Sequence, residues 1–309
     1  MPVDAPKHFL VDTDLTPREQ ADVLDDAARR KKDRRGDAPL DGRSVALIFE
    51  KPSTRTRLSF DVGVHELGGH PLVIDSQGSQ LGRGEPIEDT ARVLSRYVSA
   101  IVIRTFGQER IVALAEAADV PVINALTDEY HPCQVLADLQ TVRERLGGTQ
   151  GVTLAYIGDG ANNMAHSLLL GGATAGMHIR IGAPSAYSPD PAVLARAAEI
   201  AAATGGSVAT TPHALEAADG ADVVYTDVFT SMGQESEQEA RRRAFEGFCV
   251  DDRIVEASAD GSIVLHCLPA HRGEEISTSV IDGPRSAVWD QAENRLHAQK
   301  ALMAHLVGR

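Results

Sequence analysis

Cysteine is scarce in this chain. Its 309 residues include three cysteines, Cys133, Cys249 and Cys267. An odd number without paired spacing argues against a disulfide framework and against a structural zinc site, which needs two pairs of ligands. We therefore expect reduced thiols, a cytoplasmic protein and no structural zinc.

Long apolar runs and an excess of basic charge are also missing. No apolar segment approaches the length of a membrane span, and the first residues contain no signal-peptide core. The chain has 44 acidic and 30 basic residues, a net charge of −14. The one basic run, at 28–35, is expected to be a solvated helix face. These features exclude a membrane and nucleic acid as expected partners.

What the chain does have is a regular alternation of apolar strands and amphipathic helices. The expected strands are 44–49, 70–75, 100–104, 121–125, 152–157, 178–183, 207–210, 222–226 and 262–266. The expected helices are 15–33, 54–68, 88–97, 107–118, 133–146, 162–175, 191–203, 212–218 and 290–307. Repeated βα units predict an α/β fold with two doubly wound parallel-sheet domains joined by interdomain helices.

The domain boundary is expected at Gly147-Gly148, because glycine commonly ends a helix. The first domain would then cover 1–147 and the second 148–289, with a final helix over about 290–309 packing back on the first. Sites in such folds lie outside the carboxyl ends of the strands.

The first chemical motif is Ser53-Thr54-Arg55-Thr56-Arg57, directly after the apolar strand 44–49. Hydroxyls, helix N-terminal N–H groups and two guanidinium groups converge there, which suits a small dianion such as a phosphate group. Cations at a helix N-terminus are otherwise unfavourable, so an idle basic turn is the weaker interpretation.

A second motif, His131-Pro132-Cys133-Gln134, opens the helix expected at 133–146. Proline is ordinary in a first helical turn, so a capped helix with an incidental His and Cys is one interpretation. In the other, His131 and Gln134 face a ligand carbonyl. A histidine beside arginines is expected to be neutral and able to donate one hydrogen bond.

The third motif follows strand 152–157 and reads Gly158-Asp159-Gly160-Ala161-Asn162-Asn163. It resembles the opening of a dinucleotide fingerprint, but Asn163 occupies the third glycine position. The next strand ends without an acid for a ribose hydroxyl, so we reject NAD. Asn163 can instead hold a carboxylate or amine, or simply cap the helix.

Two further strands end in polar groups. Asp227 follows strand 222–226 and can pair with a substrate ammonium, although a solvated turn is the simpler interpretation. The polar stretch from Ser231 to Arg243 is predicted to be a mobile loop that folds over the site. Cys267 ends strand 262–266 beside His266, either as a small buried residue or as a thiol with an altered pKa.

Together these motifs resemble the ornithine carbamoyltransferase family over nearly the whole chain. The matching segments are Phe49–Arg57, Gly78–Glu85, His131–Gln134, Gly158–Asp159, Asn162–Asn163, Ser231–Gly233 and His266–Pro269. The segment 53–57 is shared with aspartate carbamoyltransferases, whereas His-Pro-Cys-Gln, Ser-Met-Gly and His-Cys-Leu-Pro favour ornithine. Phe229 departs from the family pattern, which has Trp there.

The resemblance implies transfer of the carbamoyl group of carbamoyl phosphate to L-ornithine, giving L-citrulline and phosphate in arginine biosynthesis. It implies no metal or organic cofactor, and a homotrimer in which Gln80 reaches a neighbouring site. The carbamoyl-phosphate ligands it implies are Ser53, Thr54, Arg55, Thr56, Gln80, Arg104, His131, Gln134, Cys267, Leu268 and Arg295. The ornithine ligands it implies are Asn163, Asp227, Ser231 and Met232. The catalytic residues it implies are Arg57, Arg104, His131, Asp227 and Cys267.

Three alternatives stay open. An aspartate carbamoyltransferase would need cations for a second carboxylate, and Asp227 with Cys267 has the wrong polarity. An enzyme for acetylated or decarboxylated ornithine would leave Asp227 or Asn163 without a partner. A non-catalytic trimer that senses either compound would not need Arg57, His131, Asp227 and Cys267 together.

Overall fold

The computed structural model describes residues 6–75, 80–230 and 238–308. The chain forms two compact units, unit 1 (Met1–Ala137 with Asn294–Arg309) and unit 2 (Asp138–Glu293). Each contains one parallel sheet, of four and five strands respectively, so the predicted α/β fold with two parallel sheets is confirmed. None of the helices in the described ranges is long and apolar enough to cross a membrane.

The sheet of unit 1 has the strand order β2-β1-β3-β4. Its strands are β1 (Ser44–Phe49), β2 (His70–Asp75), β3 (Ala100–Arg104) and β4 (Val122–Leu126). The helical elements of this unit are η1 (Asp12–Asp14), α1 (Pro17–Lys32), α2 (Thr54–Glu66), η3 (Leu81–Arg83), α3 (Ile87–Leu94) and α4 (Gln108–Ala117), with parts of α5 (Pro132–Leu146) and α12 (Val288–Val307).

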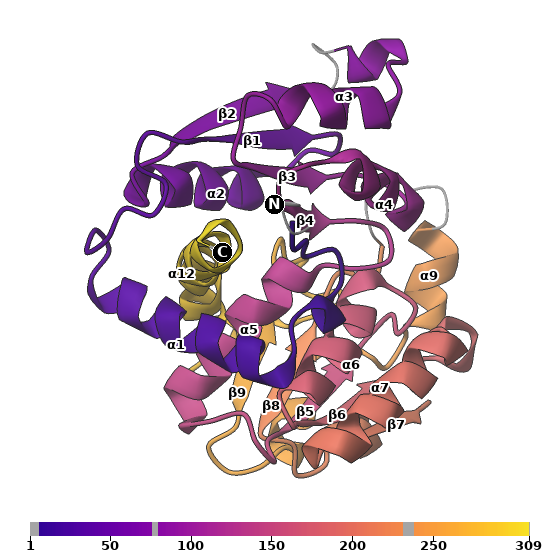
Figure 1. Cartoon of the computed structure of the whole chain (residues 1–309). Coiled ribbons are helices and arrows are strands. Elements are labelled where there is room, and N and C mark those ends of the chain that lie inside the picture. Colours follow the sequence, from indigo (N-terminus) through magenta and orange to yellow (C-terminus); the bar gives the residue numbers. More distant parts are fainter. Residues whose placement is uncertain (1–5, 76–79, 231–237, 309) are drawn as a thin grey trace. The chain divides into compact units, whose positions relative to one another are not determined.

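Both faces of this sheet are covered, and β1 shows why its sequence is continuously apolar. Val45 and Leu47 pack in a core with α2 and the last turns of α12. Ala46 and Ile48 lie on the opposite face, in a core with residues of α3 and α4. Figure 1 shows α2 beside β1 and β2, which it contacts. The carboxyl ends of β1, β3 and β4 are therefore fixed side by side.

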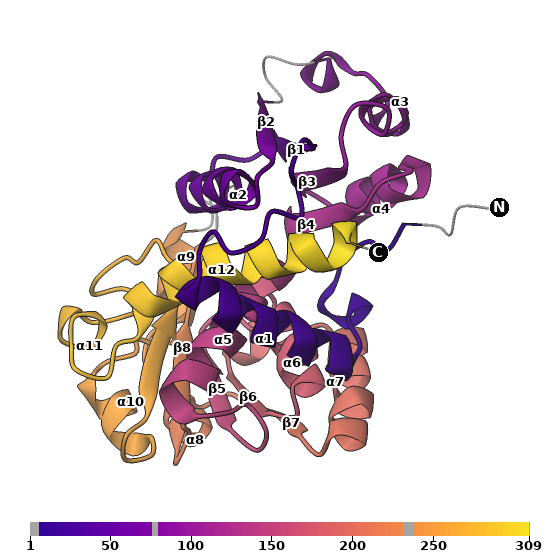
Figure 2. The ribbon, with the colours of Figure 1, turned by 60° about the vertical axis from the view of Figure 1, so that its left-hand side comes forward.

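The sheet of unit 2 has the order β7-β6-β5-β8-β9, with the chain winding outwards in both directions from β5. Its strands are β5 (Thr153–Ile157), β6 (His178–Gly182), β7 (Ser207–Thr211), β8 (Val223–Thr226) and β9 (Ile263–His266). Its remaining helical elements are α6 (Asn163–Thr174), η4 (Ser185–Tyr187), α7 (Pro191–Thr204), α8 (Ala214–Ala218), α9 (Gln238–Ala244), α10 (Asp252–Ala257) and α11 (Thr278–Ile281). Figure 2 shows α6 and α7 side by side along the sheet, where they contact each other.

The predicted polar loop from Ser231 to Arg243 contains a helix, and the prediction is wrong there. Residues 238–244 form α9, and Arg241 on this helix is buried. Residues 231–237 lie outside the described part of the chain.

The basic run at 28–35 is also more than a solvated face. The side chain of Arg30 is 4% exposed, and it pairs with Asp26 at 2.6 Å and Asp37 at 2.9 Å. The Lys31 ammonium donates a hydrogen bond to the Asn294 side chain at 2.8 Å. Some of the basic side chains in this run are therefore paired with acidic or polar neighbours.

Candidate active site

The first turn of α2 carries the hydroxyl and guanidinium groups that were predicted to bind an anion. Ser53 is the N-cap, and its hydroxyl accepts a hydrogen bond from the Thr56 backbone N–H at 3.3 Å. Thr54 begins the helix, Thr56 is buried, and Arg55 is exposed, as is Arg57. Two exposed cations at the positive end of a helix dipole favour a bound anion.

Arg104 lies at the carboxyl end of β3 and is buried. The register of β3 against β4 shifts between Ile103 and Arg104, and such irregularities re-aim side chains at strand ends. The Arg104 carbonyl accepts a hydrogen bond from the Glu50 N–H at 2.9 Å, which ties the ends of β1 and β3 together.

Glu50 is a buried carboxylate that the sequence analysis did not identify. Arg110 binds it through two nitrogens, at 2.7 Å and 2.8 Å, and the Thr105 hydroxyl also donates to it. Burial alone would raise the pKa of Glu50, but these hydrogen bonds lower it overall. Through these hydrogen bonds, the charged Glu50 connects the loop before Ser53 to the residues that follow β3.

His131 is buried beside two arginines of unit 1, as its motif predicted. Burial lowers the pKa of His131 well below its ordinary value, and the charges of Arg295 and Arg104 lower it further. The ring is therefore neutral at pH 7 and can donate one hydrogen bond without carrying charge.

Arg295, on α12, joins several of these groups. Its guanidinium donates to the Gln134 side-chain oxygen at 2.7 Å and to the Thr56 hydroxyl at 3.3 Å. Unit 1 thus brings together Thr56, Gln134 and Arg295, with Arg104 and His131 within electrostatic reach. The result is a buried group of positive and neutral hydrogen-bond donors.

Two further residues of these motifs are Cys133 and Gln80. Cys133 is fully buried, its thiol donates to the Asn124 carbonyl at 3.2 Å, and burial raises its pKa to about 12. It is a packing residue, as one interpretation of its motif had it. Gln80 is exposed at the start of η3.

In unit 2, Asp227 and Cys267 meet at the carboxyl ends of the neighbouring strands β8 and β9. The Cys267 thiol donates to Asp227 Oδ1 at 3.0 Å, and the Val228 N–H donates to the same oxygen at 2.8 Å. Burial raises the pKa of Asp227, although His266 and these hydrogen bonds act in the opposite direction. Asp227 is therefore a buried carboxylate suited to a cationic ligand.

Behind Cys267 lies a buried histidine–glutamate pair that sequence patterns did not reveal. His266 Nδ1 accepts a hydrogen bond from the Leu268 N–H at 2.8 Å, and His266 Nε2 lies 3.0 Å from Glu275 Oε1. The same Glu275 oxygen accepts from the His271 N–H at 2.5 Å. These bonds fix the backbone of Leu268, whose φ of 59° is unusual for a non-glycine residue.

Asn162, rather than Asn163, is the N-cap of α6. Its side-chain oxygen accepts from the Ala165 N–H at 2.9 Å, and its amide donates to the Tyr156 hydroxyl at 2.8 Å. Capping therefore does not explain Asn163, the first residue of the helix. Ser231 and Met232, both predicted ornithine ligands, lie outside the described residues.

Other residues of the chain occupy the space beside the glycine-rich turn after β5. A Cβ placed on Gly160 would lie 2.8 Å from the Tyr187 carbonyl oxygen and 2.9 Å from Pro189. In a dinucleotide fold this glycine lets the backbone approach a pyrophosphate, whereas here it accommodates η4 and the loop after it.

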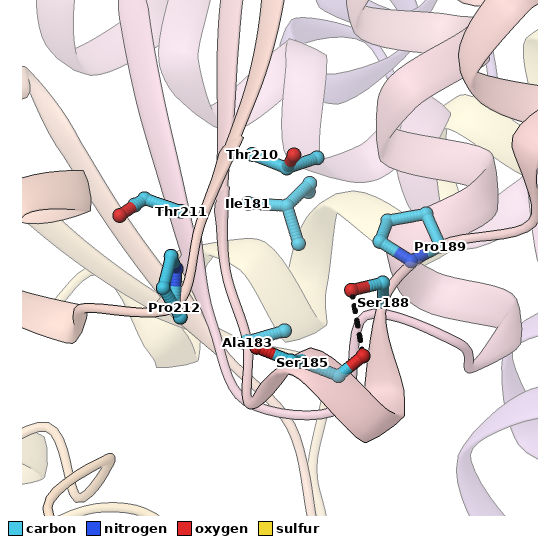
Figure 3. Close-up of a pocket in the computed structure, with 8 residues that line it drawn as sticks. All are labelled: Ile181, Ala183, Ser185, Ser188, Pro189, Thr210, Thr211 and Pro212. Atoms are coloured by element: carbon cyan, nitrogen blue, oxygen red, sulfur yellow. Dashed lines mark hydrogen bonds between the residues drawn. The ribbon is translucent and has the colours of Figure 1, made fainter.

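A small cavity lies at the carboxyl ends of β6 and β7 (Figure 3). Its lining residues are Ile181, Ala183, Ser185, Ser188, Pro189, Thr210, Thr211 and Pro212. The volume of about 60 Å³ holds a few water molecules at most, and no lining residue is titratable. This cavity is not the chemical site.

Some of these side chains could also hold a metal ion. Possible ligand atoms of Asp227, His266 and Cys267 lie within 4.8 Å of one another, as do those of His271, Glu274 and Glu275. In the first group, the hydrogen bond from Cys267 to Asp227 already accounts for that proximity.

Both units match models of the same protein family. Residues 7–144 match a family model described as aspartate/ornithine carbamoyltransferase, carbamoyl-P binding domain. Residues 150–306 match its counterpart, the Asp/Orn binding domain. The chain is 66% identical over 302 residues to an ornithine carbamoyltransferase from Acidothermus cellulolyticus, covering 97% of this chain and 96% of that protein.

Two solved structures have the same fold over nearly their full length. An ornithine carbamoyltransferase from Pyrococcus furiosus is 47% identical with a TM-score of 0.94, covering 98% of both chains. An anabolic ornithine carbamoyltransferase from Campylobacter jejuni is 38% identical with a TM-score of 0.91, covering 97% of this chain and 98% of that one.

Proposed function

The chain belongs to the aspartate/ornithine carbamoyltransferase family, and we propose that it transfers the carbamoyl group of carbamoyl phosphate to the δ-amine of L-ornithine. The products are L-citrulline and phosphate, and the reaction serves arginine biosynthesis in the cytoplasm. The observation that carries the choice of ornithine is the pairing of buried Asp227 with the Cys267 thiol, which suits an ammonium and repels a second carboxylate.

Unit 1 binds carbamoyl phosphate in this proposal. Ser53, Thr54, Arg55 and Thr56 hold the phosphate group, and Arg57 positions it. Arg104, His131, Gln134 and Arg295 surround the carbamoyl group. A neutral His131 donates to the carbamoyl oxygen as negative charge develops there, which lowers the barrier most when the donors are already in place.

Unit 2 binds ornithine. Asp227 and Asn163 hold the α-ammonium and the α-carboxylate, with Ser231 and Met232 as further ligands. Leu268 and Cys267 lie beside the reacting groups. The neutral δ-nitrogen forms a bond to the carbamoyl carbon, the bond from that carbon to the phosphate oxygen breaks, and the proton that the nitrogen loses ends on the released phosphate. Phosphate leaves with both electrons of the broken bond.

A comparison of substrates tests the proposal. Ornithine should be turned over, whereas putrescine, N-acetylornithine and aspartate should react at least about a hundredfold more slowly, because a buried polar group left without its partner is costly. Rates are compared at equal concentrations by assaying the ureido product. Comparable turnover of putrescine would show that the α-groups are not recognised, and turnover of aspartate would favour the other branch of the family.

Cys267→Ala should weaken ornithine binding and change the pH–rate profile while leaving carbamoyl-phosphate binding nearly intact. The δ-amine of ornithine starts near a pKa of about 10.4, like that of lysine, and must lose its proton before it attacks. The thiol of Cys267 lies on Asp227 and can help to position or deprotonate that amine. If the ornithine KM and the pH profile both match the parent, Cys267 only fills space.

The protein should be a homotrimer whose subunits share sites. Leu58 and Val62 on α2 are 58% and 37% exposed, and the partly exposed strand β2 is an edge strand, so this side of unit 1 can form an interface. Light scattering should give three times the chain mass of 32.9 kDa. Mixing Gln80→Ala with Arg57→Gly subunits should restore sites that neither variant has alone. A monomer at micromolar concentration would contradict the shared site.

A further inference from the structure

The buried ion pair between Asp159 and Arg241 lies outside all the predicted roles. Arg241 is on α9 and is 6% exposed, and Asp159, in the turn after β5, is 3% exposed. Arg241 Nη1 lies 2.7 Å from Asp159 Oδ2. The next two residues of α9, Arg242 and Arg243, are exposed, so burial distinguishes Arg241 from its neighbours.

The guanidinium of Arg241 connects two loops. It also donates to the Phe229 carbonyl at 3.0 Å, and Phe229 is two residues after Asp227. Asp159 in turn accepts from the Ala161 N–H at 2.9 Å, one residue before the N-cap of α6. One cation therefore ties the turn that precedes Asn163 to the loop that carries Asp227.

Aromatic packing fixes the position of this cation. Arg241 lies 4.9 Å from the ring centroid of Tyr187, and Tyr187 contacts Phe245 with centroids 4.7 Å apart. Phe229 stacks on Phe245 with centroids 4.6 Å apart and an interplanar angle of 9°. The ion pair is thus held on one side by a packed aromatic group and cannot shift without disturbing it.

The hydrogen bonds of Arg241 join loops at the carboxyl ends of two central strands, β5 and β8. β5 and β8 are neighbours, and the chain winds away from them in opposite directions, so their carboxyl ends form the point where ligands bind in doubly wound folds. Along the chain, 68 positions separate Asp159 from Asp227, so no short covalent connection joins the two loops. Their spacing depends on contacts such as the one Arg241 makes.

We propose that Arg241 is a positioning residue for the ornithine site, holding the Asp227 loop at a fixed spacing from the start of α6. Arg241 does not take part in the chemistry and acts through Asp159 and the Phe229 carbonyl. The proposal rests on the proposed function, because it assigns the spacing to the recognition of the α-groups of ornithine.

Arg241→Gln and Arg241→Lys test it, with Arg243→Gln on the exposed side of the same helix as the control. Arg241→Gln should raise the ornithine KM by about tenfold to a hundredfold, the scale of a site whose groups are displaced by about 1 Å. The inhibition constant of L-norvaline, which keeps the α-groups and lacks the δ-amine, should rise in the same proportion. The carbamoyl-phosphate KM should stay within about twofold, because all of its proposed ligands except Cys267 and Leu268 are in unit 1. Lysine should give an intermediate effect, since one ammonium cannot reproduce the planar fork.

A loss of stability alone would not produce this pattern. Asp159→Asn should give the same split between the two KM values, and the double variant should be no worse than the worse single one, because both changes break one contact. Thermal unfolding of each variant identifies the fraction folded, and Asp159→Asn and Arg241→Lys decide the question if Arg241→Gln does not fold.

Two results would overturn the positioning role. The first is an ornithine KM within about twofold of the parent in folded Arg241→Gln. The second is an equal rise in both KM values. Either result leaves the proposed function intact, provided that the parent protein forms citrulline. If the parent forms no citrulline at all, the proposed function fails first, and the positioning role fails with it.

Discussion

Replacing Arg57 by glycine should lower kcat/KM by about a hundredfold or more, because lost preorganised donors cost on the order of 3 kcal/mol. Charge develops on the leaving phosphate during transfer, and Arg57 lies exposed in the first turn of α2, where an anion binds. The same cation is unfavourable at an unliganded helix N-terminus. Without phosphate, the variant should therefore lose little beyond the helix propensity of one residue.

Steady-state kinetics and thermal unfolding of Arg57→Gly check both parts. Arg18→Gly is the matched control, since Arg18 is an exposed arginine in the first turn of α1. The control should lose a similar amount of stability and retain its activity. Near-normal turnover by Arg57→Gly would show that Arg57 is only structural.

Asp227→Asn should raise the ornithine KM by about a hundredfold or more, because breaking a buried charge pair costs about 3–5 kcal/mol. The amide keeps the shape of the side chain and removes the charge that holds an ammonium. Carbamoyl-phosphate binding should be nearly unchanged. An ornithine KM within a few-fold of the parent would contradict the assignment of Asp227.

The pH dependence of ornithine binding should change in the same variant. Burial raises the pKa of Asp227, and only its ionised form attracts the α-ammonium. In the parent, affinity should therefore be present above this raised pKa and should fall as the pH drops through it. Asp227→Asn should lack this acidic limb, which a profile of the ornithine inhibition or binding constant would show.

The sheets could be predicted because their strands are apolar along their whole length and are separated by amphipathic helices. Strand 44–49 has the predicted bounds, and α2 begins at Thr54, as predicted. The segment that became α9 could not be predicted, because Gln-Glu-Ala-Arg-Arg-Arg-Ala has no apolar periodicity. It is held by the buried ion pair of Arg241, which is a tertiary contact.

The residues of the candidate site could be predicted only in part, because some of them also depend on tertiary contacts. His131 was predicted to be neutral from its neighbours, and burial and two arginines indeed lower its pKa. Glu50 and Glu275 were missed, because a buried carboxylate in a loop has the same sequence signature as a solvated one. Their partners, Arg110 and His266, are fixed by the fold. The substrate roles of the site residues remain predictions.

An isotope label on the carbamoyl carbon distinguishes transfer to ornithine from binding without catalysis. Purified protein is incubated with labelled carbamoyl phosphate and L-ornithine, and the label is followed by NMR. We predict that the label appears in citrulline, with one phosphate released per citrulline, and that citrulline formation stops when ornithine is left out. Label that passes only to the hydrolysis products of carbamoyl phosphate, at the rate seen in buffer, would contradict carbamoyl transfer and indicate a protein that binds without catalysis.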